Sequence, residues 1–157
     1  MDILNEHQIR MEELIPLIRE QLATNKCVKF SPRGSSMLPM LRQGIDHVVL
    51  SPLPHKLKKY DLPLYQRSNG KYVLHRIVRV GETYTCAGDN QVVLEYGLRQ
   101  EQMIAVVTAY TRDGKPHSVN SISYRLYCRL WHHTRLLRRI WRGLGRRMAR
   151  LFRKKSP

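Results

Sequence analysis

The sequence predicts a mostly β fold: a small twisted antiparallel β domain flanked by an N-terminal helix and a basic amphipathic C-terminal helix. The middle of the chain holds short strand-like runs with turn signals every few residues, which is typical of antiparallel β structure. Both ends instead repeat apolar residues at helical spacing. Because the chain has 157 residues, we expect one domain with appendages. We place a helical segment at residues 1–25, the β domain at 26–118 and a basic tail at 119–157.

The N-terminal helix is expected over residues 4–24. Its apolar positions share helical spacing and are Leu4, Met11, Ile15, Ile18 and Leu22. Pro16 lies inside this pattern and predicts a kink or two shorter helices, because proline removes a backbone hydrogen bond.

The β domain is expected to consist of short strands joined by turns. These strands are expected over residues 27–31, 47–50, 62–67, 72–80, 84–87 and 102–111. Asn69-Gly70 joins two of the runs and is a strong hairpin signal. Pro52 and Pro54 mark a loop, because proline does not donate to an interior ladder.

The basic tail is predicted to be helical from Ile122. One face of that helix carries apolar residues, namely Leu126, Leu130, Leu137, Trp141, Leu144, Met148 and Leu151. Residues 114–157 hold 13 Lys and Arg and no Asp or Glu, which gives +13. Residues 1–113 hold 15 Lys and Arg against 12 Asp and Glu, so their net charge is only +3. The basicity of the chain therefore belongs to the tail.

The sequence also argues against several classes of protein. No apolar run approaches the roughly 18 residues that span a bilayer, and the acidic N-terminus lacks the pattern of a secretory signal. Cys27, Cys86 and Cys128 fit neither a CxxC-type metal site nor a full disulfide framework, so we interpret them as reduced thiols. We therefore expect no metal, no cofactor and exposure to the cytoplasm.

Three short segments carry groups suited to joint catalysis. Ser35 and Ser36 lie in a turn after the first strand, but a serine hydroxyl is inert near neutral pH unless a base takes its proton. His75 lies on a partly apolar strand face with Val73 and Ile77, where burial keeps an imidazole neutral and available as a base. Asp89 lies in a turn, where its carboxylate could orient a histidine. Each residue alone has an ordinary explanation in turn formation or packing.

Together these segments resemble the signal-peptidase family of serine endopeptidases, and more loosely the related repressor-cleavage peptidases. The resemblance covers residues 28–110. Gly34-Ser-Ser-Met-Leu-Pro-Met-Leu41 matches the family's nucleophile box, and Gly88-Asp-Asn90 matches its Gly-Asp-Asn box. Residues 42–49 and 57–65 resemble the boxes between them, with Tyr60 in place of a glycine. His75 stands where most bacterial members carry lysine, which resembles the endoplasmic-reticulum and sporulation types.

The resemblance implies a role for each residue. Ser36 is implied to be the nucleophile, His75 the general base and Asp89 the orienting group, with Asp61 as the alternative. Gly34 and Ser35 are implied to support the oxyanion site, where backbone N–H groups donate. The flanking strands are implied to bind an extended peptide by β-addition. The substrate-binding residues would be Val28, Phe30, Met37, Leu74 and Ile77.

The tail predicts a partner besides the peptide substrate. An arginine-rich helix with leucine and tryptophan on one face fits the plane of an anionic membrane. The residues expected at that surface are Trp131, Arg138, Trp141 and Arg142. Packing of the helix on the β domain and binding of nucleic acid are the alternatives, of which we favour nucleic acid least. The expected location is peripheral, at the cytoplasmic face of a membrane.

The sequence therefore predicts a serine endopeptidase of signal-peptidase type that removes a signal or leader peptide from a precursor. One alternative is a non-catalytic module that binds a membrane or nucleic acid on a degenerate peptidase core. The other is a self-cleaving repressor-type regulator, which we disfavour because few residues precede Ser36 and leave little room for an upstream domain.

Overall fold

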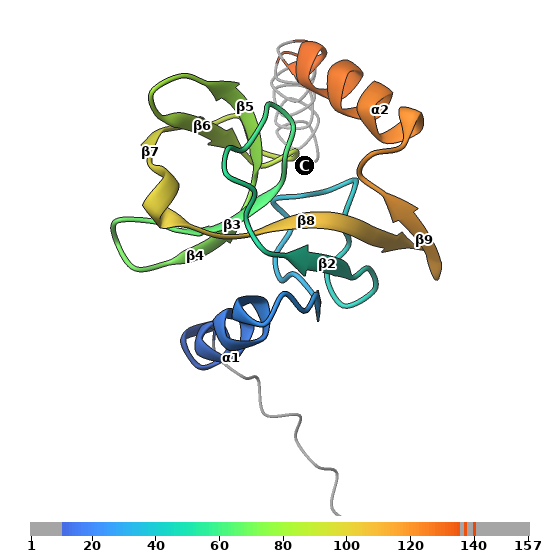
Figure 1. Cartoon of the computed structure of the whole chain (residues 1–157). Helices are drawn as coiled ribbons and strands as arrows, with labels where there is room; N and C mark the ends of the chain where they lie inside the picture. Colours follow the sequence, from blue (N-terminus) through green and yellow to red (C-terminus); the bar gives the residue numbers. More distant parts are fainter. Residues whose placement is uncertain (1–10, 136, 138–139, 141–157) are drawn as a thin grey trace, which may run out of the picture.

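The computed structural model describes residues 11–135, 137 and 140, and the fold is mostly β, as predicted. The elements in chain order are α1 Met11–Ala23, β1 Val28–Phe30, β2 Val48–Ser51, β3 Pro63–Gln66, β4 Tyr72–Leu74, β5 Arg76–Val80, β6 Tyr84–Ala87, β7 Glu95–Leu98, the 3₁₀ turn η1 Gln100–Gln102, β8 Met103–Arg112, β9 Lys115–Ser118 and α2 Ile122–His133. The two helices lie at opposite ends of the molecule with the strands between them (Figure 1).

The strands form two antiparallel sheets. The larger sheet has the order β1-β2-β8-β3-β4, and β9 pairs with β8 beside this path. The smaller sheet has the order β5-β6-β7. Strands β1 and β4 are therefore the two ends of the main path of the larger sheet.

One predicted strand is in fact two. The run at 72–80 was expected to be continuous, but it divides at His75, which belongs to neither β4 nor β5. Leu74 pairs with Leu64 in the larger sheet, whereas Arg76 pairs with Ala87 in the smaller one. No glycine or proline marks this change of sheet, so no local pattern predicts it.

Three other differences concern short elements. Strand β7 was not predicted, because Gly97 has a φ of 71° and interrupts an alternating pattern. Strand β9 was missed as well, since Pro116 lies inside it and proline marks an edge position. Pro16 lies within a single helix, α1, so the prediction of two shorter helices is wrong. The predicted helical residues 4–10 lie outside the described part of the chain.

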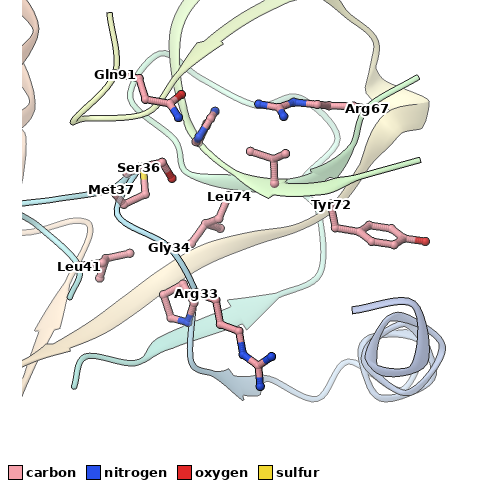
Figure 2. Close-up of a pocket in the computed structure, with 12 residues that line it drawn as sticks. Arg33, Gly34, Ser36, Met37, Leu41, Arg67, Tyr72, Leu74 and Gln91 are labelled. Atoms are coloured by element: carbon pink, nitrogen blue, oxygen red, sulfur yellow. The ribbon is translucent and has the colours of Figure 1, made fainter. Parts of the chain in front are cut away.

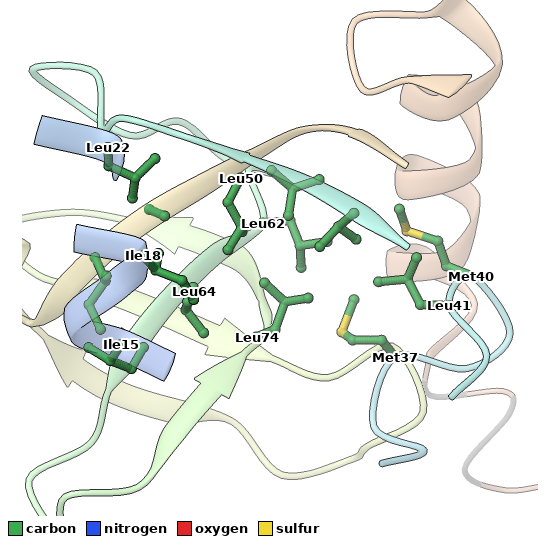
Figure 3. Packing of buried hydrophobic residues seen from close by; sticks show 14 of the residues in the cluster. Ile15, Ile18, Leu22, Met37, Met40, Leu41, Leu50, Leu62, Leu64 and Leu74 are labelled. Carbon is green, nitrogen blue, oxygen red and sulfur yellow. The ribbon is translucent and has the colours of Figure 1, made fainter. Parts of the chain in front are cut away.

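Two hydrophobic clusters occupy the opposite faces of β3 and β8. Leu64 belongs to the first cluster and its neighbour Tyr65 to the second, because successive strand residues point to opposite faces. The first cluster receives Ile15, Ile18 and Leu22 from α1 (Figure 3). The second lies between the larger and the smaller sheet.

Helix α2 completes the first cluster from its other end. Tyr124 and Cys128 of α2 are buried in the same cluster as the three α1 residues. The predicted boundaries at 25/26 and 118/119 thus separate segments that share one core. Within the described residues, no helix has the length and apolarity needed to cross a bilayer.

Candidate active site

The segment with the two serines is a loop whose apolar residues are anchored in the first cluster. It follows β1, turns at Gly34 with a φ of 88°, and contains a cis peptide bond between Leu38 and Pro39. Met37, Met40 and Leu41 are at most 5% exposed and point into the core (Figure 3). Ser36, directly before Met37, is half-buried. Burial of the neighbouring apolar side chains therefore fixes the position of Ser36.

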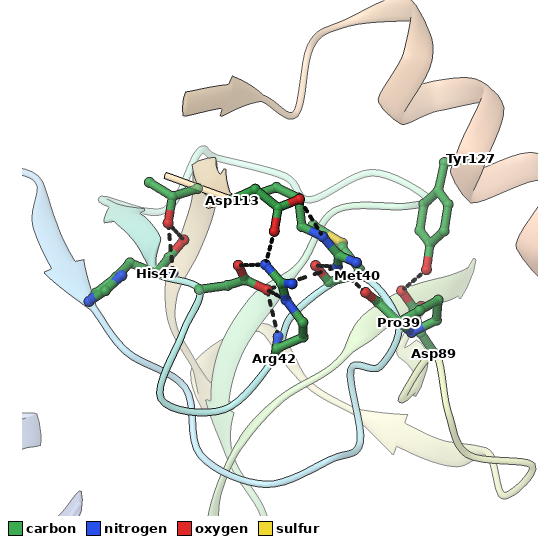
Figure 4. Close-up of polar contacts among 10 residues, drawn as sticks. Pro39, Met40, Arg42, His47, Asp89, Asp113 and Tyr127 are labelled. Carbon is green, nitrogen blue, oxygen red and sulfur yellow. Dashed lines mark hydrogen bonds and ion pairs between the residues drawn. The ribbon is translucent and has the colours of Figure 1, made fainter. Parts of the chain in front are cut away.

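Charged groups hold the end of this loop. Asp46, only 1% exposed, accepts hydrogen bonds from the backbone N–H and guanidinium of Arg42 at 2.8–2.9 Å. Arg42 also contacts Asp113 at 2.7 Å (Figure 4). Arg112 donates to the carbonyls of Pro39 and Met40. The sequence box at residues 42–49 thus has a structural role in closing the serine loop.

The Gly88-Asp-Asn90 segment lies against the serine loop. The backbone N–H of Asn90 donates to the Ser36 carbonyl at 2.8 Å, and its side-chain amide donates to the Ser35 carbonyl at 3.1 Å. A Cβ built on Gly88 would lie 2.7 Å from the Ser36 carbonyl oxygen and 3.1 Å from His75 Nε2. Gly88 is therefore the point at which the serine loop and the histidine ring meet.

Ser36 and His75 line one cavity of about 220 Å³. Figure 2 shows Ser36 and Gln91 on one side of it, with Arg67 and Tyr72 from the β3–β4 hairpin region on another. The remaining lining residues come from the serine loop and from β4: Pro32, Arg33, Gly34, Met37, Leu41, Val73 and Leu74. The cavity thus lies between strand β4 and the segment that follows β1. Strands β1 and β4 are the two end strands of the main path of the larger sheet.

His75 is held by a carboxylate that the sequence analysis missed. Its Nδ1 lies 2.8 Å from Oε1 of Glu95, the first residue of β7. A carboxylate accepts, so Nδ1 carries the proton and Nε2 presents a lone pair. No residue in the described ranges forms a hydrogen bond with Nε2. Burial lowers the pKa of His75, although the negative charge of Glu95 opposes this effect, so the ring is neutral near pH 7.

Glu95 is itself fixed by Arg67. The guanidinium donates to both carboxylate oxygens, at 2.7 Å and 2.5 Å. The Tyr65 hydroxyl lies 3.4 Å from His75 Nδ1, beside the same carboxylate. Burial alone would raise the pKa of Glu95, but Arg67, Tyr65 and His75 together lower it. Glu95 is therefore ionised, and bidentate contacts of this kind fix its orientation.

Asp89 has a different role from the predicted one. Its carboxylate accepts from Arg76 Nε at 2.9 Å and Nη2 at 2.8 Å, and from the Tyr127 hydroxyl at 3.0 Å. Arg76 is buried, so its charge requires this partner. Asp89 as the orienting group of His75 is thus corrected to Glu95. The alternative, Asp61, accepts from the Lys58 backbone N–H, and burial raises the pKa of Asp61.

The predicted substrate-binding residues separate into three groups. Leu74 and Met37 line the cavity, although Met37 is only 3% exposed. Val28 and Phe30 lie on β1 and are half-buried against the first cluster. Ile77 is 0% exposed inside the second cluster, so its assignment to substrate binding is wrong. Because the strand is interrupted at His75, Ile77 lies on β5 and packs in the second cluster.

The predicted membrane residues are mostly outside the described part of the chain, as Arg138, Trp141 and Arg142 are. The exception is Trp131, which is half-buried. Its indole N–H donates to the Asp89 carbonyl at 2.8 Å, and its ring stacks on Tyr127 at 5.6 Å between centroids. Trp131 therefore packs against the Gly-Asp-Asn loop, and its assignment to a membrane surface is wrong.

The two residues that complete the site, Arg67 and Glu95, lie 28 residues apart in the sequence. The local pattern offered one sign of Glu95, an acidic residue in a mostly apolar segment after Gly88-Asp-Asn90. Because the chain has 12 acidic residues, this sign did not distinguish Glu95 from the others. Among the residues that the structure describes, no group of three or more His, Cys, Asp or Glu is placed to bind a metal ion.

Comparisons with known proteins identify no relative: no protein-family model, curated protein or solved structure matches this chain.

Proposed function

We propose that this protein is a serine endopeptidase of signal-peptidase type, with Ser36 as nucleophile, His75 as general base and Glu95 as the residue that positions His75. One observation carries the proposal. Glu95 fixes the tautomer of His75, which leaves Nε2 unprotonated, and His75 and Ser36 line the same cavity. Pre-positioned Ser–His–carboxylate groups are recognised by geometry and role and occur in several chain orders.

Acylation follows from these roles. His75 Nε2 takes the hydroxyl proton as Ser36 Oγ forms a bond to the scissile carbonyl carbon. Glu95 stabilises the resulting imidazolium, and backbone N–H groups of the serine loop donate to the oxyanion. The C–N bond then breaks, and the imidazolium returns the proton to the leaving amine. This leaves an acyl ester on Ser36 and releases the C-terminal part of the peptide.

Deacylation repeats the sequence with water. His75 removes a proton from a water molecule as its oxygen attacks the ester carbon. The ester C–O bond breaks, Ser36 Oγ recovers the proton through His75, and the N-terminal peptide leaves as a carboxylate. The neutral state of His75 near pH 7 suits both steps.

The proposed substrate is an extended segment of a precursor. Strand β4 borders the cavity and is an end strand of its sheet, so its free edge is open to β-addition by a peptide. The segment after β1 borders the opposite side. A peptide between them would pass Leu74 and Met37 before its carbonyl reached Ser36. We propose a signal or leader peptide as this substrate.

We also propose peripheral attachment to an anionic membrane. The support is the net charge of +13 in residues 114–157, which contain no acid. Such a segment is attracted to an anionic leaflet by about 1 kcal/mol for each basic residue near the surface.

The peptidase proposal is tested with a library of natural peptides and identification of new N-termini by mass spectrometry. We expect cleavage by the unmodified protein and none by Ser36→Ala or His75→Ala. Ser68→Ala, which changes an exposed turn serine, serves as the matched control and should cleave normally. Cleavage that persists in both site variants would end the proposal and favour a non-catalytic core.

A further inference from the structure

Helix α2 has two apolar faces, and only one of them packs on other residues that the structure describes. The inner face packs on the first cluster and on the Gly-Asp-Asn loop through Tyr124, Tyr127, Cys128 and Trp131. The outer face consists of Ile122, Leu126 and Leu130, which are 83%, 55% and 58% exposed. Residues 122, 126 and 130 share one side of this helix, because they repeat every four positions.

The outer face is unusual for a surface. Single exposed aliphatic residues are common on proteins, but a continuous row of them marks a site of interaction. The whole row belongs to one helix, whose inner face is already buried. Amphipathicity explains one apolar stripe on a surface helix, and the second stripe needs another explanation.

A cationic groove lies beside α2. It has a volume of about 610 Å³ and runs between the loop before β3, strand β8 and the helix. Its basic lining residues are all exposed and are Lys56, Lys58, Lys59, Arg125 and Arg129. None of the five forms an ion pair with a residue in the described ranges. Asp61 is the one acidic residue among the described residues that line the groove, and burial raises its pKa.

These two features identify the chemistry of the occupant. Arg125 and Arg129 belong to α2 and line the groove, so the cations flank the aliphatic row on the same helix. Nucleic acid would use the cations but would leave three aliphatic side chains in water. A second copy of the chain would cover those side chains but would bring two strongly basic segments together. An anionic lipid surface satisfies both, since it offers hydrocarbon next to phosphate.

We infer that the outer face of α2 docks on an anionic membrane, with its aliphatic side chains among the lipid chains and the cationic groove at the headgroup phosphates. The inference rests on the proposed peripheral attachment, but it does not depend on the peptidase activity. The helix lies in the plane of the membrane, and its inner face continues to hold the Gly-Asp-Asn loop.

The test is co-sedimentation of the full chain with vesicles of phosphatidylcholine alone or with added phosphatidylglycerol. We expect binding that requires phosphatidylglycerol and weakens with salt. The double variant Leu126→Gln and Leu130→Gln should lose about tenfold or more in vesicle affinity, because two aliphatic groups are removed from the contact at unchanged charge. The single variants Leu130→Gln on α2 and Leu17→Gln on α1 are compared as a matched control, because both leucines are 58% exposed. Leu17→Gln should bind vesicles normally.

Two arms separate the causes of failure. Absence of vesicle binding by the unmodified chain would overturn both the attachment and the docking face, while peptide cleavage would still stand or fall on its own test. Vesicle binding that the double variant keeps would overturn the docking face alone. A dimer detected by light scattering and dissolved by the double variant, or tight duplex DNA binding without vesicle binding, would also overturn it.

Discussion

Glu95 lies 2.8 Å from Nδ1 of His75, so the carboxylate that orients the predicted base comes from β7 and not from the Gly-Asp-Asn loop. Replacement by glutamine keeps the shape of the side chain but removes its charge. We expect Glu95→Gln to reduce kcat/KM for a cleaved peptide by about 10²-fold or more, because the imidazolium loses its counter-charge. Circular dichroism should show an intact fold, and an unchanged rate would exclude Glu95 from the mechanism.

The pH profile of the same variant gives a signed prediction. Burial lowers the pKa of His75, and Glu95 opposes that shift. Removal of the negative charge therefore lowers the pKa further. The acidic limb of kcat/KM, which reports the base in the free enzyme, should move to lower pH in Glu95→Gln. A limb that moves to higher pH would contradict the assigned contact.

Arg67 should act in the opposite direction. Its positive charge lowers the pKa of His75 and also lowers that of Glu95. In Arg67→Gln the acidic limb should therefore move to higher pH, with a smaller loss of rate than in Glu95→Gln. The two limbs are measured with one peptide and one buffer series. Shifts of equal sign in both variants would show that neither reports the electrostatics of His75.

Gly88 gives a steric prediction with a close control. An alanine Cβ there would lie 2.7 Å from the Ser36 carbonyl, so the serine loop must move. We expect Gly88→Ala to destroy most peptide cleavage and to destabilise the fold by about 1–3 kcal/mol, as overpacking does. At Gly81 the nearest atom would be 3.7 Å away, and Gly81→Ala should behave like the unmodified protein. Equal activity of the two variants would contradict the close approach at Gly88.

Asp89 should matter for stability through Arg76. In Asp89→Asn the buried guanidinium loses its counter-charge, which costs about 3–5 kcal/mol in the free energy of unfolding for a broken buried pair. Urea denaturation measures the change. Asp113→Asn is the control, since that carboxylate is 70% exposed in its pair with Arg42, and exposed pairs contribute little. A stable Asp89→Asn protein would show that Arg76 has another source of compensation.

The sequence was sufficient for the parts of the site that local pattern determines. The strand at 84–87 was predicted with its observed bounds. The serine loop and the Gly88 segment, which were singled out as separate motifs, lie in contact. The role of Glu95 could not be predicted from the sequence, because it depends on the pairing of β7 with β6 and on Arg67, which directly follows β3. Whether Asp89 or Glu95 contacts the His75 ring is decided by strand pairing and tertiary packing, and residue spacing in the sequence does not predict it.

The tail shows the same limit. Its apolar periodicity correctly predicted the helix over Ile122–His133, but not which side faces the core. Tyr124 and Cys128 are the buried side of α2, whereas Leu126 and Leu130 are exposed. The decisive contact is the Arg76 guanidinium, which donates to the Tyr124 hydroxyl at 2.6 Å and to Cys128 Sγ at 2.9 Å. The buried cation therefore contacts the side of the helix that carries Tyr124 and Cys128, and the side that carries the leucines is exposed.

The division of the 72–80 run at His75 has a consequence for how this protein could evolve or be engineered. Ser36 is anchored in the first cluster, while Glu95 belongs to the smaller sheet, and His75 stands where the chain passes from one to the other. The alignment of these three residues thus depends on how the first and second hydrophobic clusters are positioned relative to each other. Substitutions in the second cluster, such as at Leu57 or Cys86, would therefore change how Ser36, His75 and Glu95 are aligned, although neither residue is one of the three.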